Sequence, residues 1–328
     1  MMLEALLQGE SLSAEQARSL AHELAREGVE PALAGAVLAA LRAKGEVADE
    51  VRGLAQGLRE LATAPAFDTP DNACDVVGTG GDGSHSYNIS TGGALLAAAA
   101  GATIVKHGNK SISSRSGAAD LLAALGISVP MPDPARTLND ANFVYLHAPA
   151  FHPAMARIAP IRKAMGVRTV FNILGPLTNP AAPPFGVIGA FSPHVAELMA
   201  HALSGMAIER VFVVHGEPGW DEATPVGPFL LFDVRPGRVE RTHRDPQEAG
   251  LNRCTPEDLR GGTPEMNADA LRCVLQGECD GAHRDALLLT AGLALEVSGL
   301  ASSMREGVDR GRAAIDGGEA AAILERLR

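Results

Sequence analysis

A short glycine-rich segment combines the residue types that bind phosphate. Gly78-Thr79-Gly80-Gly81-Asp82-Gly83 follows the acidic and β-branched run Asp75-Val76-Val77, and Asn88-Ile89-Ser90-Thr91 then precedes small residues typical of a helix. Glycines let several backbone N–H groups point at one place, and a helix N-terminus behind them adds partial positive charge. The order of strand, glycine loop and helix start therefore predicts a phosphate site.

A second polar run follows the next expected strand, residues 102–105. Lys106-His107-Gly108-Asn109-Lys110 holds two of the four lysines in the chain, and the serine-rich residues 111–117 come next. Ligands of open α/β sheets bind at the carboxyl ends of the strands, so both runs are expected to share one pocket. Either run alone could also be a solvated turn without a ligand. The Rossmann and Walker A patterns do not occur, which excludes the usual NAD and ATP loops.

Two adjacent carboxylates, Asp221 and Glu222, follow a turn after the expected strand 210–215. Mg²⁺ is usually held by one or two carboxylates together with substrate phosphate and water. The pair therefore predicts a magnesium site beside the phosphate loop. The alternative is an ordinary solvated acidic turn.

The N-terminal residues predict helices. Ser13-Ala14-Glu15-Gln16 is a capping-box pattern, and apolar residues at helical spacing follow it as far as Gly28. Pro31 can begin a second helix, and residues 51–61 predict a third. The first 65 residues are thus expected to be helical, with residues 66–74 as a linker.

Strands and helices alternate through the rest of the chain, which predicts an α/β fold with a mostly parallel central sheet. We expect a helical domain over residues 1–68, joined by helices within 154–180, and an α/β domain over 69–328. The segment 171–180 is expected to connect the two domains. The expected elements are a helix at 117–125, strands at 143–146, 186–191 and 210–215, a hairpin of 229–234 with 239–241, and helices from Met266 onward.

The bulk composition restricts the partners. The chain has 328 residues, 46% of them hydrophobic, and a formal net charge of −11. Length and composition allow a large core, while the negative charge disfavours nucleic acid or an acidic membrane as the main partner. No apolar run has membrane length, and no signal peptide is evident, so we expect a cytoplasmic protein.

The four cysteines predict reduced thiols, because they form no C-x-x-C pair and have no secretory context. We therefore expect no disulfide. Cys273, Cys279, His243 and His283 carry zinc-ligand side chains, but their spacing matches no common zinc motif.

These motifs, in this order and at these separations, resemble the anthranilate phosphoribosyltransferases of tryptophan biosynthesis. The resemblance covers nearly the whole chain. It rests on the segments 78–83, 88–91, 106–109, 152–155, 171–180 and 261–265 and on Arg162, Asp221 and Glu222. It implies a nucleoside phosphorylase/phosphoribosyltransferase-like fold, usually a homodimer formed through the helical part. It also implies that phosphoribosyl pyrophosphate (PRPP) and anthranilate react to give N-(5-phosphoribosyl)anthranilate and pyrophosphate, and that Mg²⁺ is the cofactor.

The resemblance also implies roles for single residues. Lys106, Asn109 and Arg162 would be catalytic, with Arg162 facing the carboxylate of anthranilate, and two magnesium ions would be held by Ser90, Asp221 and Glu222. His152 could instead be a packed core histidine, and Arg162 a structural ion-pair partner. PRPP would be bound by Gly78, Gly80, Gly81, Asp82, Ser86, Asn88, Ser90, Thr91, Lys106 and Ser116, and anthranilate by His107, Asn109, His152 and Arg162.

Three positions depart from the family pattern: Gly92-Gly93, Thr290, and the bulky approach Pro218-Gly219-Trp220 to the two carboxylates. At these positions the family pattern does not predict the mobility of the glycine loop or the rate of turnover. Two other functions remain possible: a pyrimidine-nucleoside phosphorylase-like enzyme, which needs no metal at Asp221 and Glu222, and a nucleic-acid-binding paralogue, which would need a basic face.

Overall fold

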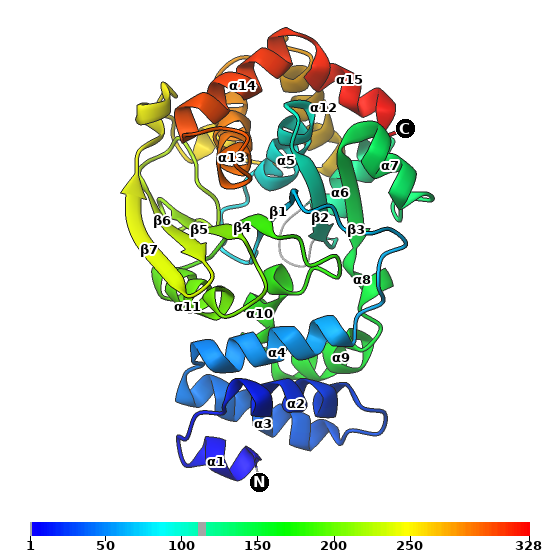
Figure 1. Cartoon of the computed structure of the whole chain (residues 1–328), viewed down its shortest axis with the longest axis vertical. Helices are drawn as coiled ribbons and strands as arrows, with labels where there is room; N and C mark the ends of the chain where they lie inside the picture. The colour runs from blue at the N-terminus through cyan, green and yellow to red at the C-terminus, as the bar shows by residue number, and fades with distance from the viewer. Residues whose placement is uncertain (1, 111–115) are drawn as a thin grey trace.

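A computed structural model describes residues 2–110 and 116–328. An N-terminal group of helices lies at one end of the molecule, and a larger α/β part, which carries the C-terminus, lies at the other (Figure 1). Ser111, Ser113 and Ser114 of the second polar run lie outside the described residues.

The elements alternate as the sequence predicts, with boundaries that shift by a few residues. The helices are α1 Met2–Leu7, α2 Ala14–Ala25, α3 Pro31–Lys44, α4 Ala48–Glu60, α5 Ile89–Ala99, α6 Ala118–Ala124, α7 Pro134–Ala141, α8 Ala148–Phe151, α9 Met155–Met165, α10 Phe171–Leu174, α11 Pro193–Ser204, α12 Pro264–Leu275, α13 Ala282–Val297, α14 Met304–Asp316 and α15 Glu319–Arg326. The short 3₁₀ helices are η1 Gly175–Leu177, η2 Pro246–Ala249 and η3 Glu257–Leu259. The strands are β1 Ala73–Gly78, β2 Thr103–Gly108, β3 Phe143–His147, β4 Phe185–Gly189, β5 Arg210–Gly216, β6 Phe229–Arg235 and β7 Arg238–Arg244.

Local sequence explains many of these boundaries. The predicted capping box starts α2: the Gln16 N–H donates to Ser13 Oγ (3.3 Å), and the Ser13 N–H donates to Gln16 Oε1 (2.8 Å). Two of the shifted boundaries affect the expected linker and the second polar run. β1 begins at Ala73, inside the expected linker, and β2 runs on to Gly108, so Lys106 and His107 belong to the strand.

The strands form one seven-stranded sheet in the order β3-β2-β1-β4-β5-β6-β7. β1 to β5 are parallel, and the β6–β7 hairpin adds two antiparallel strands at one edge. The strand order turns at β1, since β2 and β3 lie on one side of it and β4 and β5 on the other. Such a switch point is where open α/β sheets bind ligands, at the carboxyl ends of the strands.

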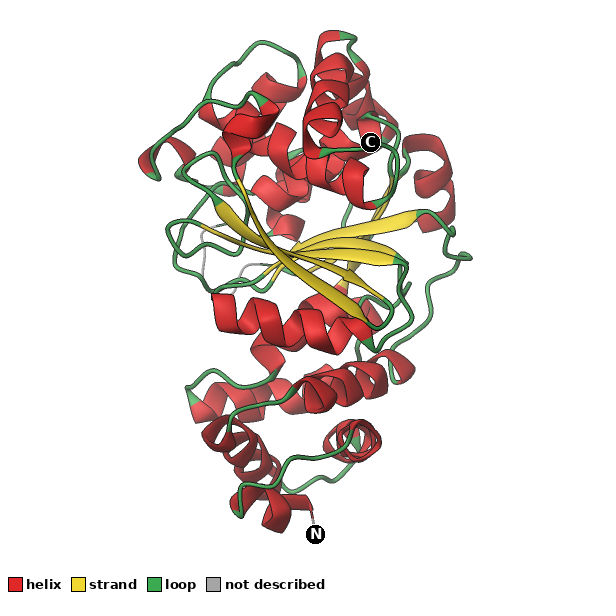
Figure 2. Cartoon of the chain, turned by 60° about the vertical axis from the view of Figure 1, so that its left-hand side comes forward, coloured by secondary structure: helices red, strands yellow, loops and turns green. Residues whose placement is uncertain are grey.

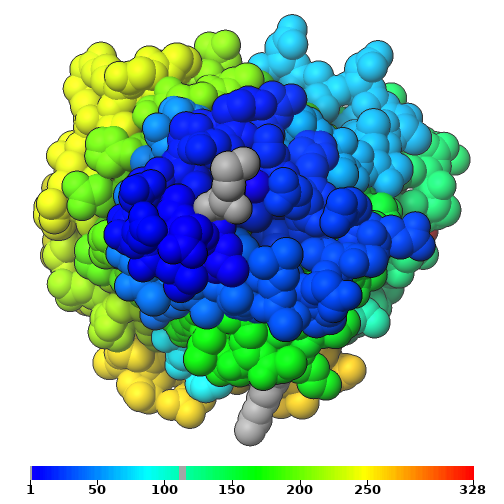
Figure 3. All heavy atoms as spheres, turned by 90° about the horizontal axis from the view of Figure 1, so that it is seen from below, coloured from blue at the N-terminus to red at the C-terminus, as the bar shows by residue number. Residues whose placement is uncertain are grey.

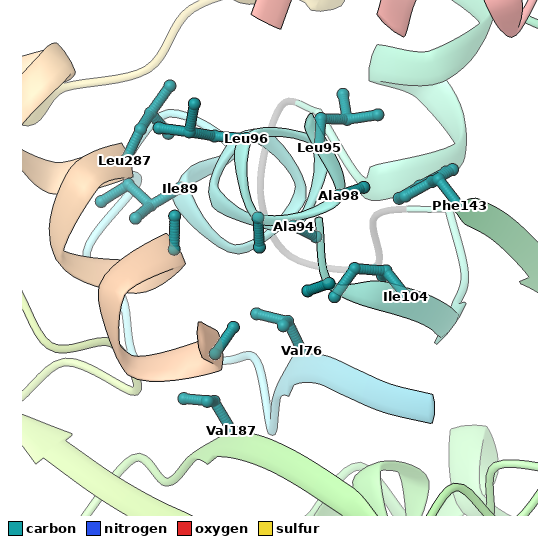
Figure 4. Close-up of a cluster of buried hydrophobic side chains, with 14 of the residues drawn as sticks. Val76, Ile89, Ala94, Leu95, Leu96, Ala98, Ile104, Phe143, Val187 and Leu287 are labelled. Atoms are coloured by element: carbon teal, nitrogen blue, oxygen red, sulfur yellow. The ribbon is translucent and has the colours of Figure 1, made fainter. Parts of the chain in front are cut away.

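Helices cover both faces of the sheet (Figure 2). On one face, α5 and α13 lie against the strands. Ala94 of α5 lies on the side of the helix that faces Val76, whereas Leu95 and Leu96 lie on the opposite side, and all four side chains belong to one buried cluster (Figure 4). The other face is covered by α11, whose buried Ala196 and Met199 belong to the same hydrophobic cluster as Leu54 of α4. The position of the N-terminal helices relative to the sheet therefore follows from a shared apolar core.

Helices from the middle of the chain join the N-terminal group. Ile158 and Ile161 of α9 and Phe171 of α10 are buried in the same cluster as Leu38 and Leu54. The segment that carries Arg162 is thus packed on the helical part while its ends lead into the α/β part. No helix within the described part of the chain is both long enough and apolar enough to cross a membrane.

The prediction that all cysteines are reduced is wrong, because Cys273 and Cys279 form a disulfide. The chain reverses after α12 at Gly277, whose φ is +73°, and the Cys279 N–H donates to the Cys273 carbonyl (3.3 Å). This turn brings the two Cα atoms to 5.3 Å, a normal distance for a disulfide. Sequence spacing could not show it, and the bonded sulfurs are no longer free to act as zinc thiolates.

Candidate active site

The glycine loop and the Asp221–Glu222 turn meet at the carboxyl ends of β1, β4 and β5. The Asp221 backbone crosses the end of β4 so closely that a Cβ on Gly189 would lie 1.5 Å from the Asp221 carbonyl oxygen. A Cβ on Gly78 would likewise lie 2.4 Å from Asp221 Oδ2. Glycine is required at both positions, because any side chain would push the carboxylates away from the loop.

Hydrogen bonds hold both carboxylates against the loop. The Gly80 N–H (2.5 Å) and the Thr79 hydroxyl (3.3 Å) donate to Asp221 Oδ2. The Ser86 hydroxyl donates to Glu222 Oε2 (3.0 Å), and the Ser90 N–H at the start of α5 donates to Glu222 Oε1 (3.1 Å). These donors orient the carboxylates but carry no full positive charge.

A third acid, Asp82, increases the negative charge of the cluster. Its Oδ2 accepts the Asp221 N–H (3.2 Å). Burial and the nearby Asp82 charge raise the pKa of Asp221 to about 7. Desolvation, followed by the charges of Asp221 and Asp82, raises the pKa of Glu222 well above its usual value. Crowded, desolvated carboxylates favour a bound cation.

The acidic cluster fits Mg²⁺ better than a metal ion whose ligands all come from the protein. Across residues 2–110 and 116–328, no three His, Cys, Asp or Glu side chains are arranged as a complete metal site. Mg²⁺ needs fewer protein ligands, since substrate phosphate and water complete its octahedron. Asp221 and Glu222 supply carboxylate oxygens, which Mg²⁺ prefers. Ser90, in the first turn of α5, adds a hydroxyl oxygen.

The start of α5 brings the two predicted polar runs together. The Ser116 hydroxyl donates to Asn88 Oδ1 (2.9 Å), and Asn88 Nδ2 donates to the Ser116 carbonyl (2.9 Å). Asn267 of α12 donates to the same Asn88 oxygen (2.9 Å). Thr91 is buried in the first turn of α5. The expected shared pocket for the two runs is therefore consistent with the fold.

Lys106 lies deeper than a lysine on a solvated loop. It is 2% exposed, and its ammonium group donates to the Val76 carbonyl. Burial lowers its pKa, while the charges of Asp75 and Glu222 act in the opposite direction. Asp75 is itself buried, and desolvation raises its pKa to about 6. Lys106 is thus a desolvated cation beneath the acidic cluster.

His107 of β2 and His152, which follows α8, lie together. Their ring centroids are 5.0 Å apart in an edge-on arrangement, and both rings are buried. Each Nε2 has no hydrogen-bond partner in the described structure. Burial, with the nearby His152 charge as a smaller cause, lowers the pKa of His107 to about 3, and burial lowers that of His152. Both imidazoles are therefore neutral. Asn109, which directly follows β2, is exposed.

Arg162 occupies a half-buried place on α9. Its guanidinium carbon lies 5.4 Å from the centre of the Phe171 ring, and burial lowers its pKa. None of the ion pairs between described residues involves it, so the structural ion-pair alternative has no partner there. A desolvated guanidinium without a carboxylate is suited to a planar carboxylate ligand.

The departures at Gly93 and Thr290 compensate each other. A Cβ on Gly93 would lie 2.5 Å from the Cβ and Cγ2 of Thr290, so the methyl-bearing threonine fills the space that the glycine leaves. Thr290 lines a small cavity together with Ser90, Asp221 and Glu222. Trp220 is buried, and its carbonyl accepts the Gly216 N–H (2.9 Å), which closes the turn before Asp221.

Sequence reasoning did not assign a role to three polar residues that support the site. Asn179 Nδ2 donates to Asp75 Oδ2 and to the Val105 carbonyl (both 2.9 Å), which fixes the acid beneath the strand ends. Asn267 orients Asn88. The sequence could have revealed Asp75, because a charged residue within an apolar strand is unusual. Nothing in the sequence marked Asn267, because its contact with Asn88 depends on the packing of α12.

Similarity to known proteins agrees with this geometry. Residues 2–62 match the helical bundle domain of a glycosyl transferase family, and residues 70–321 match its a/b domain. The chain is 44% identical to the anthranilate phosphoribosyltransferase of Methylobacterium nodulans, covering 97% of this chain and 94% of that protein. The crystal structure of the Thermus thermophilus enzyme is 41% identical, with a TM-score of 0.91 and coverage of 99% and 98%.

The yeast enzyme is a more distant relative. The structure of anthranilate phosphoribosyltransferase from Saccharomyces cerevisiae in complex with PRPP and Mg is 26% identical, with a TM-score of 0.87 and coverage of 99% and 95%. A second structure of it, 25% identical with a TM-score of 0.86, contains 4-fluoroanthranilate and covers the same shares. With family models that span nearly the whole chain and relatives above 40% identity, the chain belongs to the anthranilate phosphoribosyltransferase family.

Proposed function

We propose that this protein transfers the phosphoribosyl group of PRPP to anthranilate in tryptophan biosynthesis, giving N-(5-phosphoribosyl)anthranilate and pyrophosphate. The observation that carries the proposal is the contact of Asp221 and Glu222 with the glycine loop and the α5 N-terminus. Oxygen ligands for a cation then lie beside a glycine loop and a helix N-terminus, which favour an anion, as a magnesium pyrophosphate requires.

The residues divide into two groups around the reacting carbon. PRPP would lie on the glycine loop and the start of α5, bound through Gly78, Gly80, Gly81, Asp82, Ser86, Asn88, Ser90, Thr91, Lys106 and Ser116. Ser90, Asp221 and Glu222 would hold Mg²⁺, and we propose two ions. Bound Mg²⁺ would neutralise charge that develops on the departing pyrophosphate. Lys106 of β2 would add a positive charge beside the departing pyrophosphate.

Anthranilate would approach from the side of α9, bound through His107, Asn109, His152 and Arg162. Arg162 would pair with its carboxylate, and Asn109 would orient it for attack. The aryl amine is neutral at pH 7, so it attacks the ribose carbon without a strong general base. Neutral, weakly basic histidines suit this reaction: their unpartnered Nε2 atoms can hydrogen-bond the substrate without removing a proton first.

The test is loss of anthranilate fluorescence on addition of PRPP and Mg²⁺. We expect consumption with both present and none when a chelator removes the metal. A nucleoside with inorganic phosphate, without metal, tests the phosphorylase alternative, and turnover there alone would contradict the proposal.

We also propose a division into a helical domain, residues 1–68 joined by helices within 154–180, and an α/β domain, residues 69–328. The burial of Ile158 of α9 and Phe171 of α10 in one cluster with Leu38 and Leu54 supports the assignment of these helices to the helical domain, and the same cluster continues through α11 onto the sheet. The N-terminal helices dominate one end of the molecule (Figure 3), and Leu7 and Leu33 are 66% and 50% exposed there. These apolar groups support a homodimer formed through this part. We also propose that the protein acts in the cytoplasm. Light scattering that shows only a monomer at micromolar concentration would contradict the dimer.

A further inference from the structure

Arg168 links the connector between α9 and α10 to the glycine loop. The residue is exposed, and its guanidinium Nη2 donates to the Gly81 carbonyl. Its guanidinium carbon also lies 4.5 Å from the centre of the Phe191 ring, within cation–π range. Two contacts thus hold this exposed arginine in one place.

Phe191 is itself tied to the same loop. Its N–H donates to Thr79 Oγ1 (3.1 Å), and the Thr79 N–H donates to the Gly189 carbonyl (3.0 Å). The contacts therefore form a closed ring from the loop to Phe191, to Arg168 and back to the loop at Gly81. Such a ring restricts the loop more than a single hydrogen bond would.

The bond to Gly81 also sets the direction of the loop's backbone groups. Gly81 has a φ of +71°, and the peptide bond that follows it is trans. In a trans peptide the carbonyl and the next N–H point in opposite directions, so occupation of the Gly81 carbonyl turns the Asp82 N–H away from Arg168. A guanidinium on the carbonyl side thus leaves the Asp82 N–H for an anion.

The positive charge of Arg168 would help the glycine loop to bind an anion. Asp82, Asp221 and Glu222 all lie at the loop, and they would repel a pyrophosphate if no cation were near. Arg168 places a permanent positive charge beside the loop without being a ligand of the metal. It differs in this from Arg162, six residues earlier, which has Phe171 as its neighbour.

We propose that Arg168 is a positioning residue for PRPP: it holds the glycine loop in its anion-binding form and couples that loop to the segment that carries Arg162. This inference rests on the proposed function, because it takes PRPP as the ligand of the loop. It assigns Arg168 no contact with the reacting atoms.

The test compares Arg168→Ala with Arg168→Lys in the full-length protein. Loss of a charge-assisted hydrogen bond should raise KM for PRPP about 10-fold or more in Arg168→Ala, while KM for anthranilate changes less than about 2-fold. Lysine can still donate to the Gly81 carbonyl but lacks the planar face for Phe191, so it should restore part of the affinity. Calorimetric titration of PRPP alone should show the same order.

Arg157→Ala is the matched control. Arg157 lies on α9 and donates to the Ala25 carbonyl (2.6 Å), so this variant removes an arginine–carbonyl contact of the same kind at a place remote from the loop. We expect its KM values to equal those of the wild type. Unchanged PRPP affinity in Arg168→Ala would overturn the inference, as would equal losses for both substrates together with a lower Tm.

Failure of the proposed function gives a different pattern. A wild-type protein that consumes no anthranilate contradicts that function, whereas the PRPP titration still compares Arg168→Ala with the wild type. If the wild type does not bind PRPP, both the function and the role of Arg168 are wrong.

Discussion

Two buried carboxylates show how differently the two parts of this molecule treat charge. Glu50 in the helical part is 0% exposed and forms an ion pair with Lys44 (3.0 Å). Its two oxygens also accept the N–H groups of Leu12 (2.9 Å) and Val47 (3.0 Å). Asp221 in the α/β part is 7% exposed, but its partners are neutral donors and its charged neighbour is Asp82.

The difference separates a structural acid from a functional one. The helical part balances the charge of Glu50 within its own fold, so that residue can stabilise the folded chain. The direct hydrogen-bond partners of Asp221 and Glu222 are neutral, so ionisation of these carboxylates destabilises the protein until a cation binds. A raised pKa alone does not identify an active site, but here it coincides with the glycine loop and the strand ends.

The largest expected effect is on stability. Glu50→Gln leaves the Lys44 ammonium buried without its partner, and we expect the free energy of unfolding to fall by about 3–5 kcal/mol. Denaturant unfolding measures this. A change below about 1 kcal/mol would show that the helical part does not depend on this ion pair, and the comparison would fail.

The second effect is on activity. Asp221→Asn combined with Glu222→Gln keeps the size of both side chains but removes their charge. We expect kcat to fall by about 10² or more, since loss of one preorganised charge stabiliser commonly has that effect. Stability without metal should stay equal or increase, because repulsion with Asp82 disappears. Near-normal turnover would return the two acids to the solvated-turn interpretation.

The smallest effect is on the pH dependence of stability. A carboxyl with a raised pKa binds its proton more tightly in the folded state, so the free energy of unfolding falls as pH rises from its unfolded pKa to its folded pKa. For Asp221 this window runs from 3.8 to about 7, and for Asp75 from 3.8 to about 6.

The decline should therefore continue between pH 6 and pH 7 in the metal-free wild type and be smaller there in Asp221→Asn. Mg²⁺, which binds the carboxylate form, should oppose it. Unfolding curves at each pH, with and without Mg²⁺, measure both changes. Identical pH profiles for the wild type and the variant would show that Asp221 ionises normally.

The sequence by itself determined the order of elements, the parallel sheet and the residue types of the site. These depend on local patterns: the Ser13–Gln16 capping box, apolar strands separated by helices, and glycines before a helix start. Such patterns act over a few residues and are read without knowledge of the fold. The resemblance to a family added the roles, including that of Arg162.

Only the tertiary structure decided which distant groups meet. The approach of Asp221 to Gly80, the fit of Thr290 against Gly93, and the bond from Arg168 to Gly81 join residues from separate elements. The Cys273–Cys279 bond depends on one turn after α12, and the burial of Lys106 depends on where β2 ends. Apart from this local disulfide, the contacts follow from the packing of helices on a sheet, which fixes positions that no local spacing encodes.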